Sequence, residues 1–308
     1  MNLINRILTG RAHIGSFGYH IAAKIFKVAT SSLDKKRLKT QHDDAQDLII
    51  LKNIHYINDK NKYHLLDIYS RKDMDDNKTI FVIHGGGLMY GDKDLNRYSN
   101  MALTRLGYKV VALSYSLVPR VNFLDQINEC LKAIEFILNN KDKYKINIDN
   151  VYLFGDSAGG LLSYTLCSLL SHQFDDIFTV NFNLDVKGVG VISPMSKLYR
   201  SDSLAVPYKN ALPKKLKKEK CYYYLCDTLK LINQTSLNPV FMTTSDKDMI
   251  RNDVLELKEV LDKSNIKNQI CDFTSTSYPL EHVFPICYPE YNESKEAFKK
   301  MDEFFRSL

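Results

Sequence analysis

Short apolar runs recur along the chain from residue 48 onward, and turn residues bound each of them. From residue 79 these runs are rich in β-branched residues and show no polar alternation, which is typical of strands buried on both faces of a parallel sheet. The first two runs are joined by the turn NDKNK and predict a hairpin. The eight predicted strands span residues 48–57, 63–69, 79–84, 109–115, 150–155, 186–193, 239–245 and 269–275.

Helical periodicity fills the segments between these runs. In residues 122–139, apolar side chains recur at the spacing of one helix face, at Phe123, Ile127, Leu131, Ile134 and Leu138. Residues 158–171, 249–264 and 290–306 show the same periodicity. Strands that alternate with helices predict an α/β fold with a mostly parallel, eight-stranded sheet that carries helices on both faces.

Two stretches break the alternation and predict a helical cap. Residues 1–45 precede the first strand, and residues 194–237 are longer than a plain crossover requires. No repeat and no Gly- or Pro-rich linker divides the chain, so we interpret residues 1–308 as one domain. Positive charges interrupt the N-terminal apolar residues, which favours an amphipathic cap helix over a signal peptide. Docking of that helix on a lipid surface is the alternative interpretation.

Composition narrows the classes of function. The chain has 308 residues, with 42 Lys and Arg against 36 Asp and Glu, a net charge of +6. Both signs are spread along the chain, which argues against a nucleic-acid partner. No apolar run approaches the roughly 18 residues of a membrane span, so we expect no stable membrane insertion. The six cysteines form no zinc pattern, and we interpret them as free thiols in a reducing cytoplasm.

The segment Gly155-Asp156-Ser157-Ala158-Gly159 fits the pattern G-x-S-x-G. It follows the predicted strand NVYLF directly and precedes a predicted helix, which is the context of a nucleophile elbow. Such an elbow turns sharply, exposes the serine oxygen and places it at a helix N-terminus that favours negative charge. The sequence therefore predicts Ser157 as a nucleophile.

A glycine loop, His84-Gly85-Gly86-Gly87, follows another predicted strand. Acyl transfer requires N–H donors for the oxyanion of its tetrahedral intermediate, and a glycine loop supplies free backbone N–H groups. We assign the backbone N–H groups of Gly86, Gly87 and Ala158 to this oxyanion hole. His84 is interpreted as support for the loop rather than as a base.

Three segments together carry a resemblance to a known family. HGGGLMYGDK (84–93), SYSLVPR (114–120) and GDSAGG (155–160) resemble the hormone-sensitive-lipase-like branch of the α/β-hydrolases, in particular its bacterial short-chain esterases. The similarity covers residues 48–308. It implies the α/β-hydrolase fold, hydrolysis of carboxylic esters in the cytoplasm, and no metal or organic cofactor. The cap of this family, built from N-terminal helices and a late insert, agrees with residues 1–45 and 194–237.

The two other members of a serine triad must follow in the order acid, then histidine. Asp246, Asp248 and Asp253 come after the strand PVFMTTS. The resemblance favours Asp248, because DMIR (248–251) is similar to the family's D-P-L-R; Asp246 is the reserve. Asp253 is interpreted as a helix-start or surface charge. His282 is the one histidine beyond the last strand, and His282-Val283-Phe284 keeps the family's H-x-F.

The sequence therefore predicts a serine hydrolase that cleaves small, short-chain carboxylic esters. Two alternatives stay open, an amidase similar to arylformamidases and a ligand-binding protein without catalysis. Retention of Ser157, Asp248 and His282 weighs against the latter. Relatives of this kind often form homodimers, so the resemblance allows a homodimer here.

Overall fold

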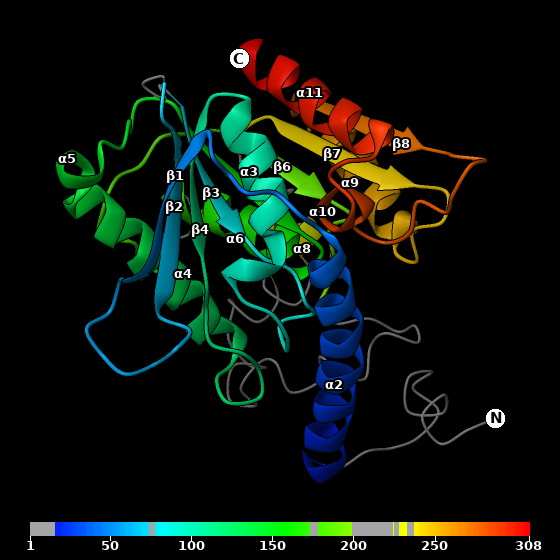
Figure 1. The fold of residues 1–308 in the computed structure, drawn as a ribbon, viewed down its shortest axis with the longest axis horizontal. Helices are drawn as coiled ribbons and strands as arrows, with labels where there is room; N and C mark the ends of the chain where they lie inside the picture. The colour runs from blue at the N-terminus through cyan, green and yellow to red at the C-terminus, as the bar shows by residue number, and fades with distance from the viewer. Residues whose placement is uncertain (1–15, 74–77, 173–177, 199–223, 225–227, 233–236) are drawn as a thin grey trace.

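One twisted sheet of eight strands organises the structure, a computed structural model that describes residues 16–73, 78–172, 178–198, 224, 228–232 and 237–308 (Figure 1). The strand order is β1-β2-β4-β3-β5-β6-β7-β8. β2 runs antiparallel to β1 and β4, and all other neighbours are parallel. The strands are β1 (Leu48–His55), β2 (Leu65–Arg71), β3 (Lys78–Ile83), β4 (Tyr108–Leu113), β5 (Val151–Asp156), β6 (Val186–Ile192), β7 (Val240–Ser245) and β8 (Asn268–Phe273).

Helices cover both faces of this sheet. The side chains of α3, α10 and α11 pack into one core cluster, and those of α4, α6, α8 and α9 pack into a second cluster on the opposite face. The helices are α2 (Ser16–Thr40), η1 (Lys93–Asn96), α3 (Arg97–Arg105), α4 (Phe123–Asn139), α5 (Lys141–Tyr144), α6 (Ala158–Leu170), α8 (Thr228–Ile232), α9 (Arg251–Lys263), α10 (Phe284–Cys287) and α11 (Asn292–Arg306). This arrangement confirms the predicted α/β fold.

Burial follows the position of each strand in the sheet. Every residue of β3, β4, β5 and β7 is buried, because these strands have a neighbour on each side and helices on both faces. β8 pairs only with β7 and is partly exposed, so the reading of residues 269–275 as a fully buried strand was wrong. A run of apolar letters does not distinguish an edge strand from a central one.

The predicted helices and the hairpin are confirmed within two residues at each end in most cases. α4 begins at Phe123 because Asn122 and Asp125 form a capping box, in which each side chain accepts a hydrogen bond from the other residue's backbone N–H. α11 buries Phe298, Met301 and Phe305 against the sheet. Burial of each such side chain stabilises the folded state by roughly 1.5–3 kcal/mol.

The predicted cap is described in part. α2 projects from the sheet and ends at Thr40. Residues 41–45 were expected to be helical, and the structure contradicts this, because they lie outside the helix. The residue that follows α2 is tied to the body of the protein: Gln41 Nε2 donates to the carbonyl of Cys287 over 2.6 Å, and Tyr98 Oη donates to the carbonyl of Gln41 over 2.6 Å. In the stretch 194–237, residues 199–223, 225–227 and 233–236 lie outside the described residues.

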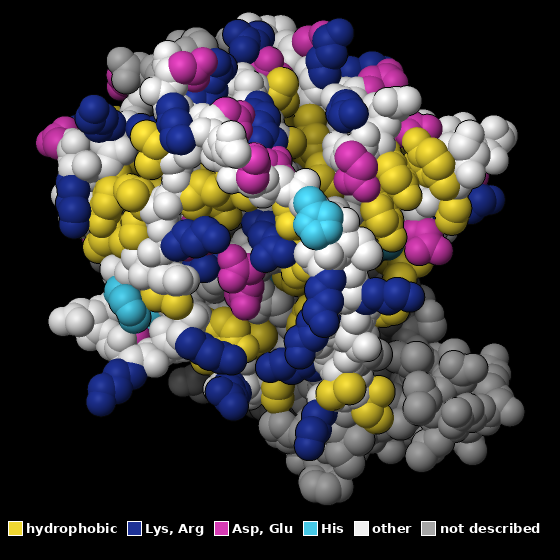
Figure 2. Space-filling view, in the orientation of Figure 1, with side chains coloured by type: hydrophobic (Ala, Val, Ile, Leu, Met, Phe, Trp, Pro, Cys, Tyr) yellow, Lys and Arg dark blue, Asp and Glu magenta, His cyan; other side chains and the backbone are white. Residues whose placement is uncertain are grey.

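The surface carries charges of both signs. Figure 2 shows acidic and basic side chains interspersed over the visible face of the sheet and its helices, whereas α2 carries mostly basic ones. Among the residues with a described placement, no helix is long and apolar enough to cross a membrane.

Candidate active site

The two glycine-containing motifs lie side by side because β3 and β5 are neighbours. Ile83 at the end of β3 pairs with Gly155 near the end of β5. Both strands run in the same direction, so the segments that follow them leave the sheet at the same edge. In open α/β sheets this edge, beyond the carboxyl ends of the strands, is where ligands bind. The glycine loop and the elbow therefore meet there.

Ser157 has the strained backbone that a nucleophile elbow requires. It lies directly before the first residue of α6 and has a φ of 50° and a ψ of −117°. The turn is held by a hydrogen bond of 2.9 Å from the Ser157 N–H to the carbonyl of Ile192. Gly159 lies against the backbone of Ile83, where a Cβ atom would collide with the carbonyl oxygen. The elbow can pack this closely on β3 only because that position is a glycine.

The side chains of Ser157, His282 and Asp248 form one hydrogen-bonded chain. His282 Nε2 lies 3.0 Å from Ser157 Oγ, and His282 Nδ1 lies 2.8 Å from Asp248 Oδ1. The three residues come from segments far apart in the sequence: Ser157 follows β5, Asp248 follows β7 and His282 follows β8. Asp246 is exposed instead and pairs with Lys247 over 3.3 Å. The structure thus brings Asp248, and not Asp246, to His282.

The carboxyl group of Asp248 is fully buried and accepts hydrogen bonds from neighbouring protein groups. Thr244 Oγ1 donates to its Oδ2 over 3.0 Å, and the Ile250 N–H donates to its Oδ1 over 3.1 Å. Burial acts to raise the pKa of Asp248, but the hydrogen bond from His282, the charge of that ring and the hydrogen bond from the Ile250 N–H outweigh burial and hold the pKa below its usual value. Asp248 is therefore a carboxylate at neutral pH.

The segment that carries His282 is fixed from both sides. Ser245 Oγ donates to the carbonyl of Leu280, and the Val283 N–H donates to Ser193 Oγ over 3.2 Å. Val283 itself adopts a positive φ of 54°, which is unfavourable for a β-branched residue. Such strain persists only where the surroundings enforce it, and here it accompanies the orientation of His282.

The glycine loop has the backbone conformation of a tight turn. Gly86 and Gly87 have positive φ values of 102° and 60°. Among the described residues, the backbone N–H groups of Gly86, Gly87 and Ala158 have no acceptor. The turn is closed on its other side, where the carbonyl of Gly86 accepts from the N–H of Tyr90 over 3.0 Å. The three N–H groups are thus available to an oxyanion.

His84 lies beneath the loop and contacts neither Ser157 nor Asp248 through a hydrogen bond. Its ring stacks on Tyr115 with 4.3 Å between centroids, and its Nδ1 donates to the carbonyl of Gly85 over 2.7 Å. Complete burial lowers the pKa of His84 to about 4, so the ring is neutral at pH 7. Tyr115 Oη also donates to the carbonyl of His84 over 2.7 Å. The structure places His84 where a supporting residue would lie.

Sequence reasoning offered two readings of Asp253 and missed Asp156. Asp253 lies in the first turn of α9, which agrees with the helix-start reading, and it is buried rather than on the surface; its Oδ2 accepts from both the N–H and Oγ of Ser196 over 3.1 Å. Asp156, inside the elbow motif, is buried and accepts from the Gly85 N–H and from Asn96. An acid flanked by glycine and serine at the end of a buried strand was the signal available for Asp156.

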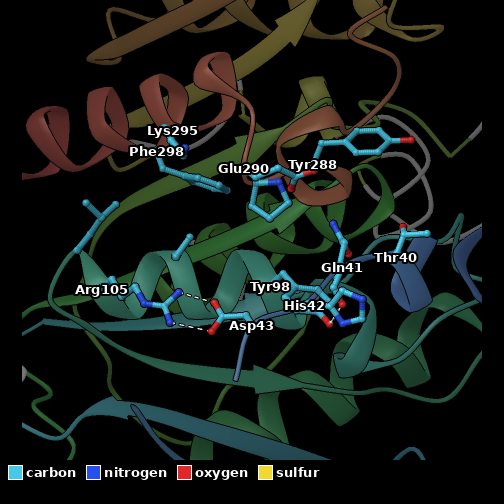
Figure 3. A pocket seen from close by; sticks show the side chains of 13 residues that line it. Thr40, Gln41, His42, Asp43, Tyr98, Arg105, Tyr288, Glu290, Lys295 and Phe298 are labelled. Carbon is cyan, nitrogen blue, oxygen red and sulfur yellow. Dashed lines mark hydrogen bonds and ion pairs between the residues drawn. The ribbon is translucent and has the colours of Figure 1, made fainter. Parts of the chain in front are cut away.

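A cavity of about 660 Å³ lies apart from these residues (Figure 3). It opens between the end of α2, α3 and the segment that joins α10 to α11, and neither the triad nor the glycine loop lines it. Arg105 closes one side through ion pairs with Asp43 and Asp47 over 2.6 and 2.7 Å. Tyr98, Tyr288 and Phe298 contribute aromatic walls.

Known proteins share this fold. Esterase B from Lactobacillus rhamnosis, in a structure with a tributyrin phosphonate, superposes with a TM-score of 0.87 at 21% identity over 96% of each chain. An esterase of the bacterial hormone-sensitive lipase family superposes with a TM-score of 0.68 at 16% identity, over 99% of this chain and 96% of that one. Both establish the fold.

Sequence comparison adds the family. An acetyl esterase of Salmonella paratyphi B is 29% identical over 86 residues, 28% of this chain and 27% of that protein. The matches to curated relatives span less than half of those proteins' own lengths. The sequence model of the BD-FAE family matches residues 66–254, more than half of the chain. The chain therefore belongs to the BD-FAE family, among the α/β-hydrolases that include the hormone-sensitive-lipase-like esterases.

Proposed function

We propose that this protein is a serine hydrolase that cleaves short-chain carboxylic esters through an acyl-enzyme. The observation that carries the proposal is the position of His282, which lies within hydrogen-bond distance of Ser157 Oγ on one ring nitrogen and of Asp248 on the other. A base that is itself oriented by a buried carboxylate is the arrangement that activates a serine hydroxyl.

The geometry supports a distinct role for each side chain. Asp248 accepts a hydrogen bond from the Nδ1–H of His282, which leaves Nε2 with a free lone pair toward the Ser157 hydroxyl. His282 takes the hydroxyl proton as Ser157 Oγ forms a bond to the ester carbonyl carbon. The resulting imidazolium is stabilised by Asp248 and then protonates the departing alcohol. Water deprotonated by His282 next attacks the acyl-enzyme, and the acid leaves as Ser157 recovers its proton.

The oxyanion of both tetrahedral intermediates would be held by the backbone N–H groups of Gly86, Gly87 and Ala158. Their lack of acceptors among the described residues supports this role. The N-terminus of α6 at Ala158 adds a favourable dipole. Each donor of this kind is worth roughly 3–4 kcal/mol of transition-state stabilisation. The reaction uses protein groups and water alone, so the proposal includes neither a metal nor an organic cofactor.

Similarity supports a short acyl group. The relative in Salmonella is an acetyl esterase, and the esterase of Lactobacillus rhamnosis was captured with a tributyrin phosphonate, which carries butyryl-length chains. We propose acetyl to butyryl esters of small alcohols as the substrate class.

The cap over the site would be formed by residues 1–45 and 194–237, within one α/β-hydrolase domain of residues 1–308. A single sheet with a core cluster on each face supports that organisation. We propose that the protein acts in the cytoplasm.

Covalent capture tests the nucleophile. A p-nitrophenyl alkylphosphonate should phosphonylate Ser157, with one p-nitrophenolate released per chain and the added mass located in the peptide that contains Ser157. Ser157→Ala should take up no label while keeping the thermal transition of the native protein. Label on another residue would move the nucleophile. Cleavage of N-formyl aromatic amides with esters left intact would instead favour the amidase.

A further inference from the structure

The glycine loop ends in a residue with an unfavourable backbone. Leu88 has a φ of 63° and a fully buried side chain. A non-glycine residue in this conformation is higher in energy by roughly 1–2 kcal/mol, so neighbouring contacts must enforce it. The loop that precedes it contains glycines that can rotate freely, which means that its shape depends on how its ends are held.

Two donors hold the carbonyl of Leu88. The Val118 N–H donates to it over 3.0 Å, and the side-chain Nε2 of Gln126 donates to it over 2.9 Å. Gln126 Nε2 also donates to the carbonyl of Ser116 over 2.9 Å. The amide nitrogen of Gln126 thus uses both of its hydrogens, and it joins the glycine loop to the segment that follows β4.

The orientation of this amide follows from chemistry. The opposite orientation would direct the Oε1 acceptor of Gln126 at two carbonyl oxygens, which repel it. In the present orientation Oε1 is buried and has no hydrogen-bond partner among the residues that the structure describes. Burial of an unsatisfied acceptor costs free energy. The buried amide can therefore stabilise the structure only through the two hydrogen bonds that Nε2 donates.

Gln126 is also held rigidly on its own helix. It lies in the first turn of α4, directly after the capping box of Asn122 and Asp125, and its side chain is fully buried. One turn further along the same face, Cys130 packs into the core without contacting the glycine loop through a hydrogen bond. Gln126 is thus a fixed point from which the loop can be positioned.

We propose that Gln126 is a positioning residue for the oxyanion hole, an inference that rests on the proposed function. By fixing the Leu88 carbonyl, its amide sets the direction of the Gly86 and Gly87 N–H groups. These donors act on the transition state more than on the bound ester, so the loss of Gln126 lowers kcat and leaves KM nearly unchanged.

The test compares Gln126→Met, of similar length but without donors, with Cys130→Ala as a control for lost packing on the same helix face. The expected result for Gln126→Met is a kcat on p-nitrophenyl butyrate that is lower by about 10–100-fold, with KM within about twofold of the wild type. The rate of phosphonylation at Ser157 falls by the same factor. Cys130→Ala lowers thermal stability and keeps the wild-type kcat.

Gln126→Glu gives a second measurement if the methionine variant does not fold. A buried carboxyl group that faces two carbonyl oxygens must be protonated and can donate only one hydrogen bond. Its kcat therefore lies between those of Gln126→Met and the wild type. A kcat within twofold of the wild type in both Gln126 variants, or an equal loss in Cys130→Ala, overturns the role of Gln126. A wild-type protein that neither cleaves esters nor takes up the phosphonate overturns the proposed function instead, and this inference with it.

Discussion

Asp156 Oδ1 accepts a hydrogen bond of 3.0 Å from the backbone N–H of Gly85, so the residue before the proposed nucleophile holds the first glycine of the loop. Asn96 Nδ2 donates to the same oxygen over 2.7 Å. The Asp156 side chain is buried, and burial raises its pKa. This contact links the elbow after β5 to the glycine loop after β3, independently of the Gln126 contact at the other end of the loop.

Asp156→Ala should therefore impair both activity and stability. The change leaves the Gly85 N–H and the Asn96 amide without an acceptor, which should cost about 1–3 kcal/mol of unfolding free energy. A loop displaced by a fraction of an ångström should lower kcat by about 100-fold. Asp156→Asn keeps an oxygen acceptor and should retain kcat within about tenfold. Steady-state kinetics and urea unfolding measure both effects, and an alanine variant with wild-type kcat would contradict the role.

Asp248→Asn should damage the rate far more than Asp246→Asn. The amide of the first variant cannot accept from His282 as a carboxylate does and can stabilise the wrong imidazole tautomer, with a loss of about 10⁴ in kcat. Asp246 is exposed and pairs only with its neighbour Lys247 among the described contacts, so its variant should stay within about twofold. The two acids lie two positions apart, which makes the second a matched control. Equal losses, or the reverse ranking, would assign the acid to Asp246.

Asp302 should make stability depend on pH. Its side chain accepts from Lys78 over 2.7 Å, from Tyr108 over 2.8 Å and from Arg306 over 2.7 Å, and so fixes α11 to the sheet. Burial acts to raise the pKa of Asp302, but these donors outweigh burial and lower it. The lowered pKa stabilises the fold above the unfolded-state pKa of about 3.9, and this stabilisation is lost as the pH falls through the folded-state value.

Asp302→Asn should consequently lower the unfolding free energy by about 1–3 kcal/mol at neutral pH. The difference from the wild type should shrink as the pH falls below about 4, because the carboxyl group becomes protonated in the unfolded state there, and it should vanish once the pH passes below the lower folded-state pKa. Urea unfolding at neutral and acidic pH measures this difference. Glu303→Gln is the control, because Glu303 lies on the same helix in an exposed pair with Lys299. A penalty that is constant with pH would refute the account of Asp302.

The elements of the sheet were predictable because each buried strand is a short apolar run with turn residues at its ends. Strand order was not predictable in the same way. β3 lies between β4 and β5, and nothing in the residues 79–84 indicates two neighbours rather than one. The partial exposure of β8 likewise results from its place at the sheet edge, which the sequence does not encode locally.

Residues of the candidate site differ in how readily the sequence predicts them. Ser157 and the glycine loop follow strands directly, so local context is enough to predict them. Asp248 required a resemblance to a known family, because three acids follow β7 and only the folded chain brings one of them to His282. Gln126 and Asp156 act through long-range hydrogen bonds from buried positions, and no local pattern indicates those partners.

Hydrolysis of p-nitrophenyl esters from acetate to palmitate, by the wild type and by Ser157→Ala, tests the central claim most directly. The proposed mechanism predicts cleavage that is strongest from acetate to butyrate, falls with longer chains, and drops by about 10⁴–10⁶ in kcat for Ser157→Ala. Ester cleavage that survives in Ser157→Ala above a hundredth of the wild-type rate would contradict the mechanism, as would a wild-type protein inactive on every ester in the series.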